Sequence, residues 1–249
     1  MKKKLVAILA CRNNSSRLYA KPLQFLDIDK KVTVIDHIIK NLKKIKIINE
    51  IVLAIADSKE NIIYENVAKK NGVRYFYGSE NNVVKRMLDC ARYTNATDIF
   101  RVTSESPFLF NEMVTSIWLE YKKEKFDAAF LDNVIDGCGF EIFNLSSLKQ
   151  SFIHSKKDYK EFVTKHIRKN SKKFKILKFI PHKKFFRRDL RLTIDYPEDL
   201  IVCREVYKQR KLKDKKFKIE EIIKFLDSRP ELKKLIGKYC SAGYKTMYL

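Results

Sequence analysis

Leu5-Val6-Ala7-Ile8-Leu9-Ala10 is an uninterrupted apolar run with the length of one β-strand. Strands of parallel sheets are covered on both faces, so they are apolar throughout and do not alternate with polar residues. A second run of this kind occupies residues 51–56. Between the two runs, apolar residues recur at helical spacing, at Ile35, Ile38, Ile39, Leu42 and Ile45. This stretch therefore predicts strand, helix and strand in the order of a parallel sheet.

The alternation of strands and helices continues to about residue 110 and then loosens. A helix at 62–68 is expected to stop at Asn71-Gly72, a typical helix-ending pair. We expect further strands at residues 73–77, 98–102, 127–131, 140–143, 174–180 and 190–194, and further helices at 83–93, 112–123, 197–209 and 219–226. The pattern predicts an α/β fold of Rossmann-like, three-layer type, in which a mostly parallel sheet carries helices on both faces.

The chain is long enough for one substantial core, with 249 residues and a hydrophobic content of 45%. We expect a single domain over residues 1–249, whose two halves (1–110 and 111–228) share one sheet and are followed by a C-terminal tail (229–249). The last residues, 241–249, are predicted to contact a partner subunit in a homodimer. Ligands of such sheets bind at the carboxyl ends of the strands, so the informative residues should follow strands.

Cysteine usage and hydropathy indicate a cytoplasmic protein. The five cysteines are scattered and form no Cys-x-x-Cys pair, which argues against a disulfide framework and a structural zinc site. The sequence has no run of 18 apolar residues, so we expect no membrane insertion. With 53 Lys and Arg against 30 Asp and Glu, the net charge is +23, which can attract nucleic acid, anionic membranes or acidic small substrates. Because the lysines are spread over several elements, a solvated surface explains this charge better than nucleic-acid binding.

The loop after the opening strand gathers positive charge. It reads Cys11-Arg12-Asn13-Asn14-Ser15-Ser16-Arg17-Leu18-Tyr19-Ala20-Lys21-Pro22-Leu23. Three cations (Arg12, Arg17 and Lys21) directly after a buried strand are costly unless an anion lies among them. Arginine forks bind phosphate oxygens, lysine is a mobile point charge, and Ser15 and Ser16 suit a phosphate nest. The loop is neither a Walker A nor a G-x-G-x-x-G loop, and on position alone an ordinary solvated loop explains it equally well.

The same loop resembles the opening loop of the CMP-sugar synthetases, the family of Kdo and acylneuraminate cytidylyltransferases. It is especially similar to the branch called spore-coat polysaccharide biosynthesis protein F. The family pattern A-R-x-x-S-[ST]-R-L-P-G-K-x-L is matched at Arg12, Ser15, Ser16, Arg17, Leu18, Lys21 and Leu23. The chain departs from it at Tyr19-Ala20, where Pro-Gly is usual, and at Cys11, where alanine precedes the arginine.

Three further stretches resemble the family at spacings that agree over most of the chain. Residues 78–84 (G-S-E-N-N-V-V) are similar to G-S-E-D-D-V-L. Residues 100–107 (F-R-V-T-S-E-S-P) are similar to V-R-[IV]-T-G-D-C-P. Residues 190–200 (L-R-L-T-I-D-Y-P-E-D-L) match L-R-L-T-[VI]-D-T-P-E-D-L almost completely.

This resemblance implies a nucleotidyltransferase of the GT-A-like fold that transfers CMP from CTP to a sugar, a sugar acid or a similar small acceptor. Pyrophosphate leaves, and the product serves surface polysaccharide or glycan synthesis. Residues 1–110 are implied to bind the nucleotide, and residues 111–228 to bind the acceptor and complete the metal site. The implied roles are catalysis for Arg12, Arg17 and Lys21; nucleotide binding for Ser15, Ser16, Ser79, Asn82 and Arg101; acceptor binding for Glu141, Lys160, Glu161 and His166; and binding of Mg²⁺, with Mn²⁺ as the alternative, for Glu105 and Asp195.

The two implied metal ligands also make sense chemically. Mg²⁺ takes one or two carboxylates together with phosphates and waters, and Glu105 and Asp195 each close an apolar strand. Glu105 stands where the family has Asp, and Asp195 is also placed to cap a helix beginning at Pro197. On the acceptor side, Phe162 replaces the histidine of the family's R-E-H-V-T, and His166, one helical turn on, is the candidate substitute.

Two other functions compete with nucleotidyl transfer. A metal-dependent glycosyltransferase of similar topology usually holds its metal with Asp-x-Asp after a strand, whereas Asp27-Ile28-Asp29 is expected in a turn. A basic nucleic-acid-binding protein without catalysis needs aromatic residues within a focused basic patch. The sequence has one such cluster, Lys183-Lys184-Phe185-Phe186-Arg187-Arg188, which also suits a polar hairpin tip or a sugar-acid clamp. Nucleic acid is therefore not expected as a partner.

Overall fold

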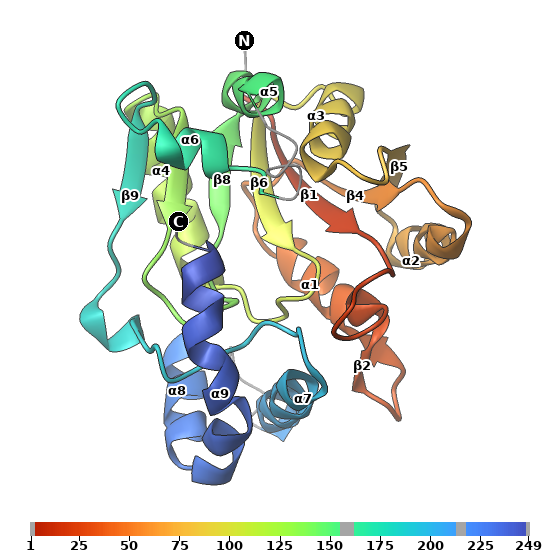
Figure 1. The fold of residues 1–249 in the computed structure, drawn as a ribbon, viewed down its shortest axis with the longest axis vertical. Helices are drawn as coiled ribbons and strands as arrows, with labels where there is room; N and C mark the ends of the chain where they lie inside the picture. Colours follow the sequence, from red (N-terminus) through yellow and green to blue (C-terminus); the bar gives the residue numbers. More distant parts are fainter. Residues whose placement is uncertain (1–2, 155–161, 213–217, 248–249) are drawn as a thin grey trace.

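The computed structural model describes residues 3–154, 162–212 and 218–247. Its centre is a seven-stranded sheet in the order β5-β4-β1-β6-β8-β7-β9 (Figure 1). The strands are β1 (Leu5–Cys11), β4 (Glu50–Ala56), β5 (Arg74–Gly78), β6 (Asp98–Thr103), β7 (Ala128–Leu131), β8 (Glu141–Asn144) and β9 (Ile176–Phe179). Strand β8 runs antiparallel to β6 and β7, and the other neighbours pair in parallel. The expected mostly parallel sheet is confirmed.

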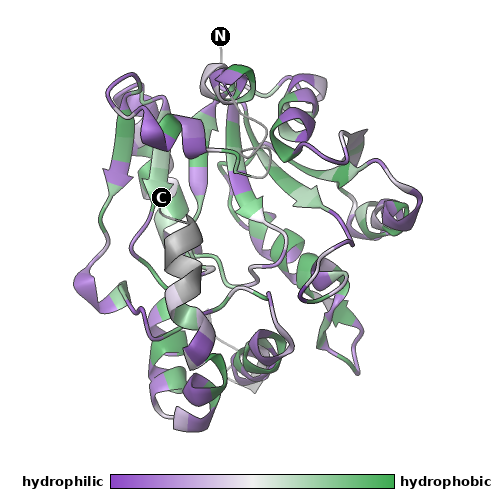
Figure 2. Cartoon of the chain, in the orientation of Figure 1, coloured by the Kyte–Doolittle hydropathy of each residue, from purple (hydrophilic) through white to green (hydrophobic). Residues whose placement is uncertain are grey.

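Helices cover both faces of this sheet. Along β1, Leu5, Ala7 and Leu9 pack into one core, and Val6 and Ile8 pack into the other, as the two-residue period of a strand requires. The first core also contains residues of α1 (Val34–Leu42), α2 (Ile63–Asn71), α4 (Val114–Lys123), α7 (Pro197–Leu212), α8 (Ile219–Asp227) and α9 (Pro230–Met247). The second contains residues of α3 (Val83–Tyr93), α5 (Leu145–His154) and α6 (Lys165–Lys169). Figure 2 shows the apolar central strands between helices with polar outer faces. The predicted three-layer arrangement is correct.

Short elements connect these layers. A hairpin of β2 (Phe25–Asp27) and β3 (Val32–Thr33) forms a second, two-stranded sheet that the sequence pattern did not predict. Single 3₁₀ turns lie at η1 (Lys21–Leu23), η2 (Lys59–Asn61), η3 (Asn111–Met113) and η5 (Lys183–Phe185). Within the described ranges, none of the helices is long and apolar enough to cross a membrane.

Two parts of the second half differ from expectation. The strand predicted at 190–194 makes one isolated bridge, between Asp136 and Arg191, and no ladder. Its apolar residues Leu190, Leu192 and Ile194 are buried by packing in the hydrophobic core. Its backbone also packs closely on Gly137, where a Cβ would lie 2.4 Å from the Thr193 nitrogen. The expected tail at 229–249 contains the helix α9, whose Leu232, Ile236 and Cys240 are buried in the core of the same chain.

Among the parallel strands of the first half, the strand order reverses at β1. Strand β1 pairs with β4 on one side and with β6 on the other, although the chain visits β4 and β5 before β6. In open α/β sheets, ligands bind outside the carboxyl ends of the strands at such a switch point. The loops after β1 and β6 are therefore the part of the fold where a site is expected.

Candidate active site

The loop after β1 is closed by an alanine in the left-handed conformation. Ala20 has φ 49° and ψ 44°, and its N–H donates to the Asn13 carbonyl at 2.9 Å. Asn13 is itself buried, and its N–H donates to the Asn61 side chain at 2.8 Å. A left-handed residue is most often glycine, because a Cβ is unfavourable there. Position 20 is where the resembled family has glycine, so the substitution leaves a left-handed turn in place at a cost in backbone strain.

The basic loop meets the end of the 190–194 segment. The Lys21 Nζ lies 2.6 Å from Oδ1 of Asp195, and an Arg17 Nη atom lies 2.7 Å from the same oxygen. Lys21 is buried, whereas Arg17 is partly exposed. Burial alone would raise the pKa of Asp195, but the Lys21 hydrogen bond and the charges of Lys21, Arg191 and Arg17 lower it. Two of the predicted catalytic cations thus contact one of the two predicted metal ligands.

A buried arginine fixes the other oxygen of Asp195. Arg191 contacts Oδ2 of Asp195, pairs with Asp136 at 2.5 Å and pairs with Asp199 at 3.1 Å. Arg191 is 2% exposed, and Asp136 and Asp199 are fully buried. Burial raises the pKa of Asp136 to about 6, and the Arg191 charge opposes that rise. Burial also raises the pKa of Asp199. The arginine therefore joins three carboxylates into one rigid unit.

Helix capping falls to Asp199 and not to Asp195. The Asp199 carboxylate accepts hydrogen bonds from the N–H groups of Asp195 and Tyr196, both at 2.9 Å, and so satisfies donors at the start of α7. The Asp195 carboxylate is directed to Lys21, Arg17 and Arg191 instead. The capping role that the sequence also allowed for Asp195 is therefore filled by Asp199.

Glu105 lies beside the same segment. The Ile194 N–H donates to the Glu105 carbonyl at 3.0 Å, which links the loop after β6 to the residue before Asp195. Among the residues that the structure describes, no three His, Cys, Asp or Glu side chains form a metal-ligand group. Two carboxylates fit Mg²⁺, which usually takes one or two from the protein and completes its shell with phosphate oxygens and water. The donor set suits a metal that arrives with a polyphosphate.

Two cavities meet at this point. One, of about 390 Å³, is lined by Arg12, Ser15, Ser16, Arg17, Lys21, Glu80, Asn81, Arg86, Arg101 and Glu105, among others. The second, of about 410 Å³, is lined by residues that include Asp132, Asp136, Glu141, Phe162, Arg168, Arg191, Asp195 and Tyr239. Arg12, Arg17, Arg101, Thr103 and Glu105 line both. The residues that line the first cavity come from the first half of the chain, and most of those that line the second come from the second half.

Comparison with known proteins identifies the family. The family model described as Cytidylyltransferase matches residues 6–236. The chain belongs to the cytidylyltransferase family. It is therefore a CTP-dependent nucleotidyltransferase. The cavity of about 390 Å³ that follows β1 is the candidate nucleotide site and is called the nucleotide cavity below. The adjoining cavity of about 410 Å³ is the candidate acceptor site and is called the acceptor cavity.

Individual relatives span the whole chain. An uncharacterized protein of Methanocaldococcus jannaschii is 28% identical over 97% of this chain and 98% of its own length. The spore coat polysaccharide biosynthesis protein SpsF of Bacillus subtilis is 26% identical over 91% of this chain and 95% of its own length. Similar folds occur in a cytidylyltransferase of Leptospira borgpetersenii (TM-score 0.82, 24% identity, 93% and 97% of the two chains). A CMP:2-keto-3-deoxy-manno-octonic acid synthetase solved with CTP gives a TM-score of 0.63 at 14% identity, over 84% and 100%.

The candidate site also contains a buried arginine that the sequence patterns did not single out. Arg86 on α3 is 2% exposed and lines the nucleotide cavity. Its Nη1 donates to the carbonyls of Ser79 at 2.9 Å and Glu80 at 3.4 Å, and burial lowers its pKa. Arg86 thus holds the turn that enters α3. No sequence signal marked it, because the apolar stripe of that helix consists of Val84, Met87, Leu88 and Ala91, and Arg86 lies off this stripe.

Two residues of this turn, Ser79 and Asn82, were predicted to bind the nucleotide. Ser79 contributes its carbonyl to Arg86, and Asn82 caps α3 by accepting from the Lys85 N–H at 2.9 Å. Their neighbours Glu80 and Asn81 line the nucleotide cavity, whereas Ser79 and Asn82 are not among its lining residues.

The predicted acceptor residues are likewise divided. Glu141 lines the acceptor cavity; burial alone would raise its pKa, but Arg101, Arg168 and a Thr164 hydrogen bond lower it to about 2. His166 lies on α6, stacked on His154 with 4.7 Å between ring centres, and is not among the lining residues. Burial and His154 lower the pKa of His166. Lys160 and Glu161 lie outside the described residues. The C-terminal helix contributes Tyr239, which stacks on Tyr196 with centroids 3.8 Å apart.

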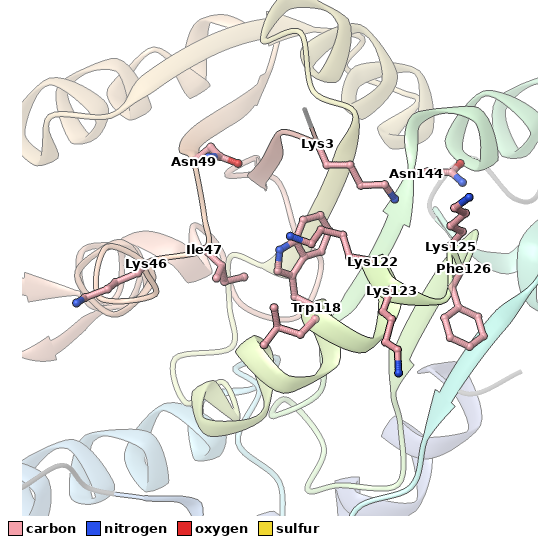
Figure 3. A pocket seen from close by; sticks show the side chains of 11 residues that line it. Lys3, Lys46, Ile47, Asn49, Trp118, Lys122, Lys123, Lys125, Phe126 and Asn144 are labelled. Carbon is pink, nitrogen blue, oxygen red and sulfur yellow. The ribbon is translucent and has the colours of Figure 1, made fainter. Parts of the chain in front are cut away.

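A third hollow, of about 1010 Å³, lies near the amino-terminal ends of β1, β4 and β7, away from the loops after β1 and β6, and contains none of the predicted site residues. Figure 3 shows lysine side chains around Trp118 there. Its described lining includes Lys3, Lys46, Lys122, Lys123 and Lys125, and no carboxylate. Part of the excess positive charge therefore gathers away from the catalytic cleft.

Proposed function

We propose that this cytidylyltransferase transfers CMP from CTP to a sugar or similar small acceptor, with Mg²⁺ or Mn²⁺, and releases pyrophosphate. The observation that carries the proposal is the ion pair between Lys21 and Asp195, at 2.6 Å, beside the wall shared by the two cavities. It joins the cationic loop to the predicted metal ligand. The relative named for spore coat polysaccharide synthesis supports a role in making a surface polysaccharide or glycan.

The reaction needs positioning and charge neutralisation more than a dedicated base. An acceptor oxygen attacks the α-phosphorus of CTP, its proton is released, and pyrophosphate leaves. Arg12, Arg17 and Lys21 hold the triphosphate and neutralise the charge that develops on the leaving pyrophosphate. Bound Mg²⁺ would be held by Asp195 and Glu105 and would polarise phosphate oxygens. When the triphosphate binds, Lys21 and Arg17 exchange the Asp195 carboxylate for phosphate oxygens, which leaves that carboxylate available.

We assign the remaining predicted residues a role according to the cavity that each one lines. We assign Ser15, Ser16 and Arg101 to nucleotide binding, because each lines the nucleotide cavity, and Glu141 to the acceptor side. Ser79 and Asn82 act through the turn that they build with Arg86. We further propose that the enzyme works in the cytoplasm as a homodimer, which light scattering of the purified protein tests directly.

The activity is tested by measuring pyrophosphate release with each of the four NTPs, in Mg²⁺ and in Mn²⁺. The acceptor panel contains neutral sugars, sugar acids and phosphorylated metabolites. We expect release with CTP and one acceptor class, and none with the other NTPs under the same conditions. Release with no combination, from protein that is shown to be folded, would contradict the proposed function.

A further inference from the structure

The inner surface of the acceptor cavity carries arginines that are already neutralised by the chain itself. Arg101 Nη1 lies 2.7 Å from Oε2 of Glu141. Arg168 pairs with the other Glu141 oxygen at 2.8 Å and makes two contacts with the Asp132 carboxylate, at 2.7 and 3.1 Å. Such two-point contacts use the geometry in which guanidinium binds carboxylates most strongly. These two arginines are therefore committed to protein carboxylates.

Of the other cations of this cavity, Arg12 and Arg17 line both cavities and are assigned to the triphosphate, whereas Arg191 and Lys165 have partners within the chain. Arg191 is shared among Asp136, Asp195 and Asp199. The Lys165 ammonium lies 4.9 Å from the centre of the Phe162 ring. Phe162 lines the cavity and stands where the resembled family has a histidine, so a group that can be charged is replaced by an apolar face.

The polar groups that remain suit hydroxyl groups. The Thr103 hydroxyl donates to Ser106 at 2.7 Å, and the Ser106 hydroxyl donates to Thr193 at 3.1 Å, and all three residues line the cavity. Asp136 also lines it, and its buried Oδ1 has no hydrogen-bond partner within the described protein. A buried acceptor without a partner is unfavourable, and a hydroxyl donor from a ligand would satisfy it.

An acidic acceptor would be disfavoured in such a cavity. It would have to separate a buried arginine from its carboxylate, or remain unpaired beside Asp132, Asp136 and Glu141, and both are costly. Unlike this cavity, the lysine-lined hollow near the amino-terminal ends of β1, β4 and β7 shows no described carboxylate among its lining residues (Figure 3). The described lining of the acceptor cavity holds five carboxylates beside six basic side chains, so the excess positive charge of the chain is not concentrated there.

We infer that the acceptor group entering this cavity is an uncharged polyhydroxyl compound, a neutral sugar or polyol, and not a sugar acid. This inference rests on the proposed function of the same site. Specificity then comes from the hydroxyl-bearing side chains and Asp136, while Glu141 and Asp132 mask Arg101 and Arg168 from anions.

The test compares acceptors that differ only in one carboxylate. Each aldose is paired with its uronic acid and each alditol with its aldonic acid, at the same stereochemistry, and kcat/KM is measured from pyrophosphate release with CTP and Mg²⁺. We expect the neutral member of the best pair to be preferred at least 10-fold. Preference for the acid would overturn the inference and leave the proposed function standing, whereas activity with neither class in the full panel would contradict the proposed function itself.

A variant provides a second measurement. Asp132→Asn keeps the shape of a partly exposed side chain and removes one of the charges that mask Arg168. We expect the ratio of kcat/KM for acid over neutral acceptor to rise about 10-fold, with CTP affinity unchanged. Glu120→Gln on the exposed face of α4 is the matched control and should leave the ratio as it is. An unchanged ratio in Asp132→Asn would contradict the masking of Arg168.

Discussion

The ammonium of Lys21 lies 2.6 Å from the carboxylate of Asp195, although 174 positions separate the two residues in the chain. Lys21 follows β1, at one side of the switch point, and Asp195 precedes α7 in the second half. Their contact brings together the phosphate-binding loop and the candidate metal ligand. Five residues around it line both cavities. The nucleotide and the acceptor can therefore meet at this point.

Replacing Lys21 by glutamine is expected to lower kcat for CMP transfer about 100-fold or more, because the charge on the leaving pyrophosphate loses a preorganised cation. Asp195 keeps Arg17 and Arg191 as partners, so the fold should survive. Pyrophosphate release measures the rate, and circular dichroism checks the fold. Lys40→Gln, at an exposed lysine of α1, serves as the control. An equal loss of kcat in Lys21→Gln and Lys40→Gln would contradict a specific role of Lys21 in the reaction.

Arg86→Met tests the turn that enters α3. We expect the KM for CTP to rise about 10-fold with a smaller change in kcat, because the carbonyls of Ser79 and Glu80 lose the donor that fixes them. Arg92→Met on the same helix removes an exposed arginine and is the matched control. If kcat falls and the KM for CTP does not change, Arg86 is not positioning the nucleotide cavity.

Ala20→Gly should stabilise the protein by about 1 kcal/mol, because alanine at φ 49° carries a left-handed backbone cost that glycine does not. The gain is reduced by the larger entropy of glycine in the unfolded chain. Urea titration of both proteins measures the difference. A destabilised Ala20→Gly variant would show that the Ala20 methyl group contributes packing that outweighs the strain.

Much of the fold was predictable because β1 and β4 are apolar throughout and the helices between strands have clear periodicity. The 190–194 segment was wrong as a strand, because Leu190, Leu192 and Ile194 are buried by packing beyond the sheet and not by a ladder. Periodicity cannot separate these two causes of burial.

The site was predictable where motifs carry charge, as at Arg17, Lys21 and Asp195. Asp136 and Arg191 escaped assignment because their pairing joins residues far apart in the sequence. Arg86 escaped because its polar partners are the backbone carbonyls of Ser79 and Glu80, which no side-chain motif marks. The role of the C-terminal helix escaped because it too depends on a distant partner: Tyr239 reaches the cavity by stacking on Tyr196.

His37 predicts a dependence of stability on pH. It is buried, with ring contacts to Phe108 and Tyr207, and burial together with Arg210 lowers its pKa from 6.5 to about 3. Below pH 6.5 the His37 imidazole becomes protonated in the unfolded chain and stays neutral in the folded protein. The free energy of unfolding therefore decreases as the pH falls towards 3. The contribution of His37 is about 1.4 kcal/mol per pH unit within this window.

The contribution of His37 is isolated by comparing slopes. The free energy of unfolding of the wild type and of His37→Phe is measured by urea titration between pH 7 and pH 5. Asp136, whose pKa is raised, acts in the opposite direction in both proteins and cancels in the comparison. The variant should show the smaller loss on acidification. Identical slopes would mean that His37 takes up a proton in the folded state.

The convergence of the loop and Asp195 on one metal-bound triphosphate is tested most directly by titrating CTP into the wild type and Asp195→Asn, with and without Mg²⁺. We predict that Mg²⁺ tightens CTP binding to the wild type at least 10-fold. In the folded Asp195→Asn variant this effect should disappear, while metal-free CTP binds at least as well, because Lys21 and Arg17 are released. A variant that keeps the full Mg²⁺ effect and full turnover would contradict the placement of Asp195 in the metal site.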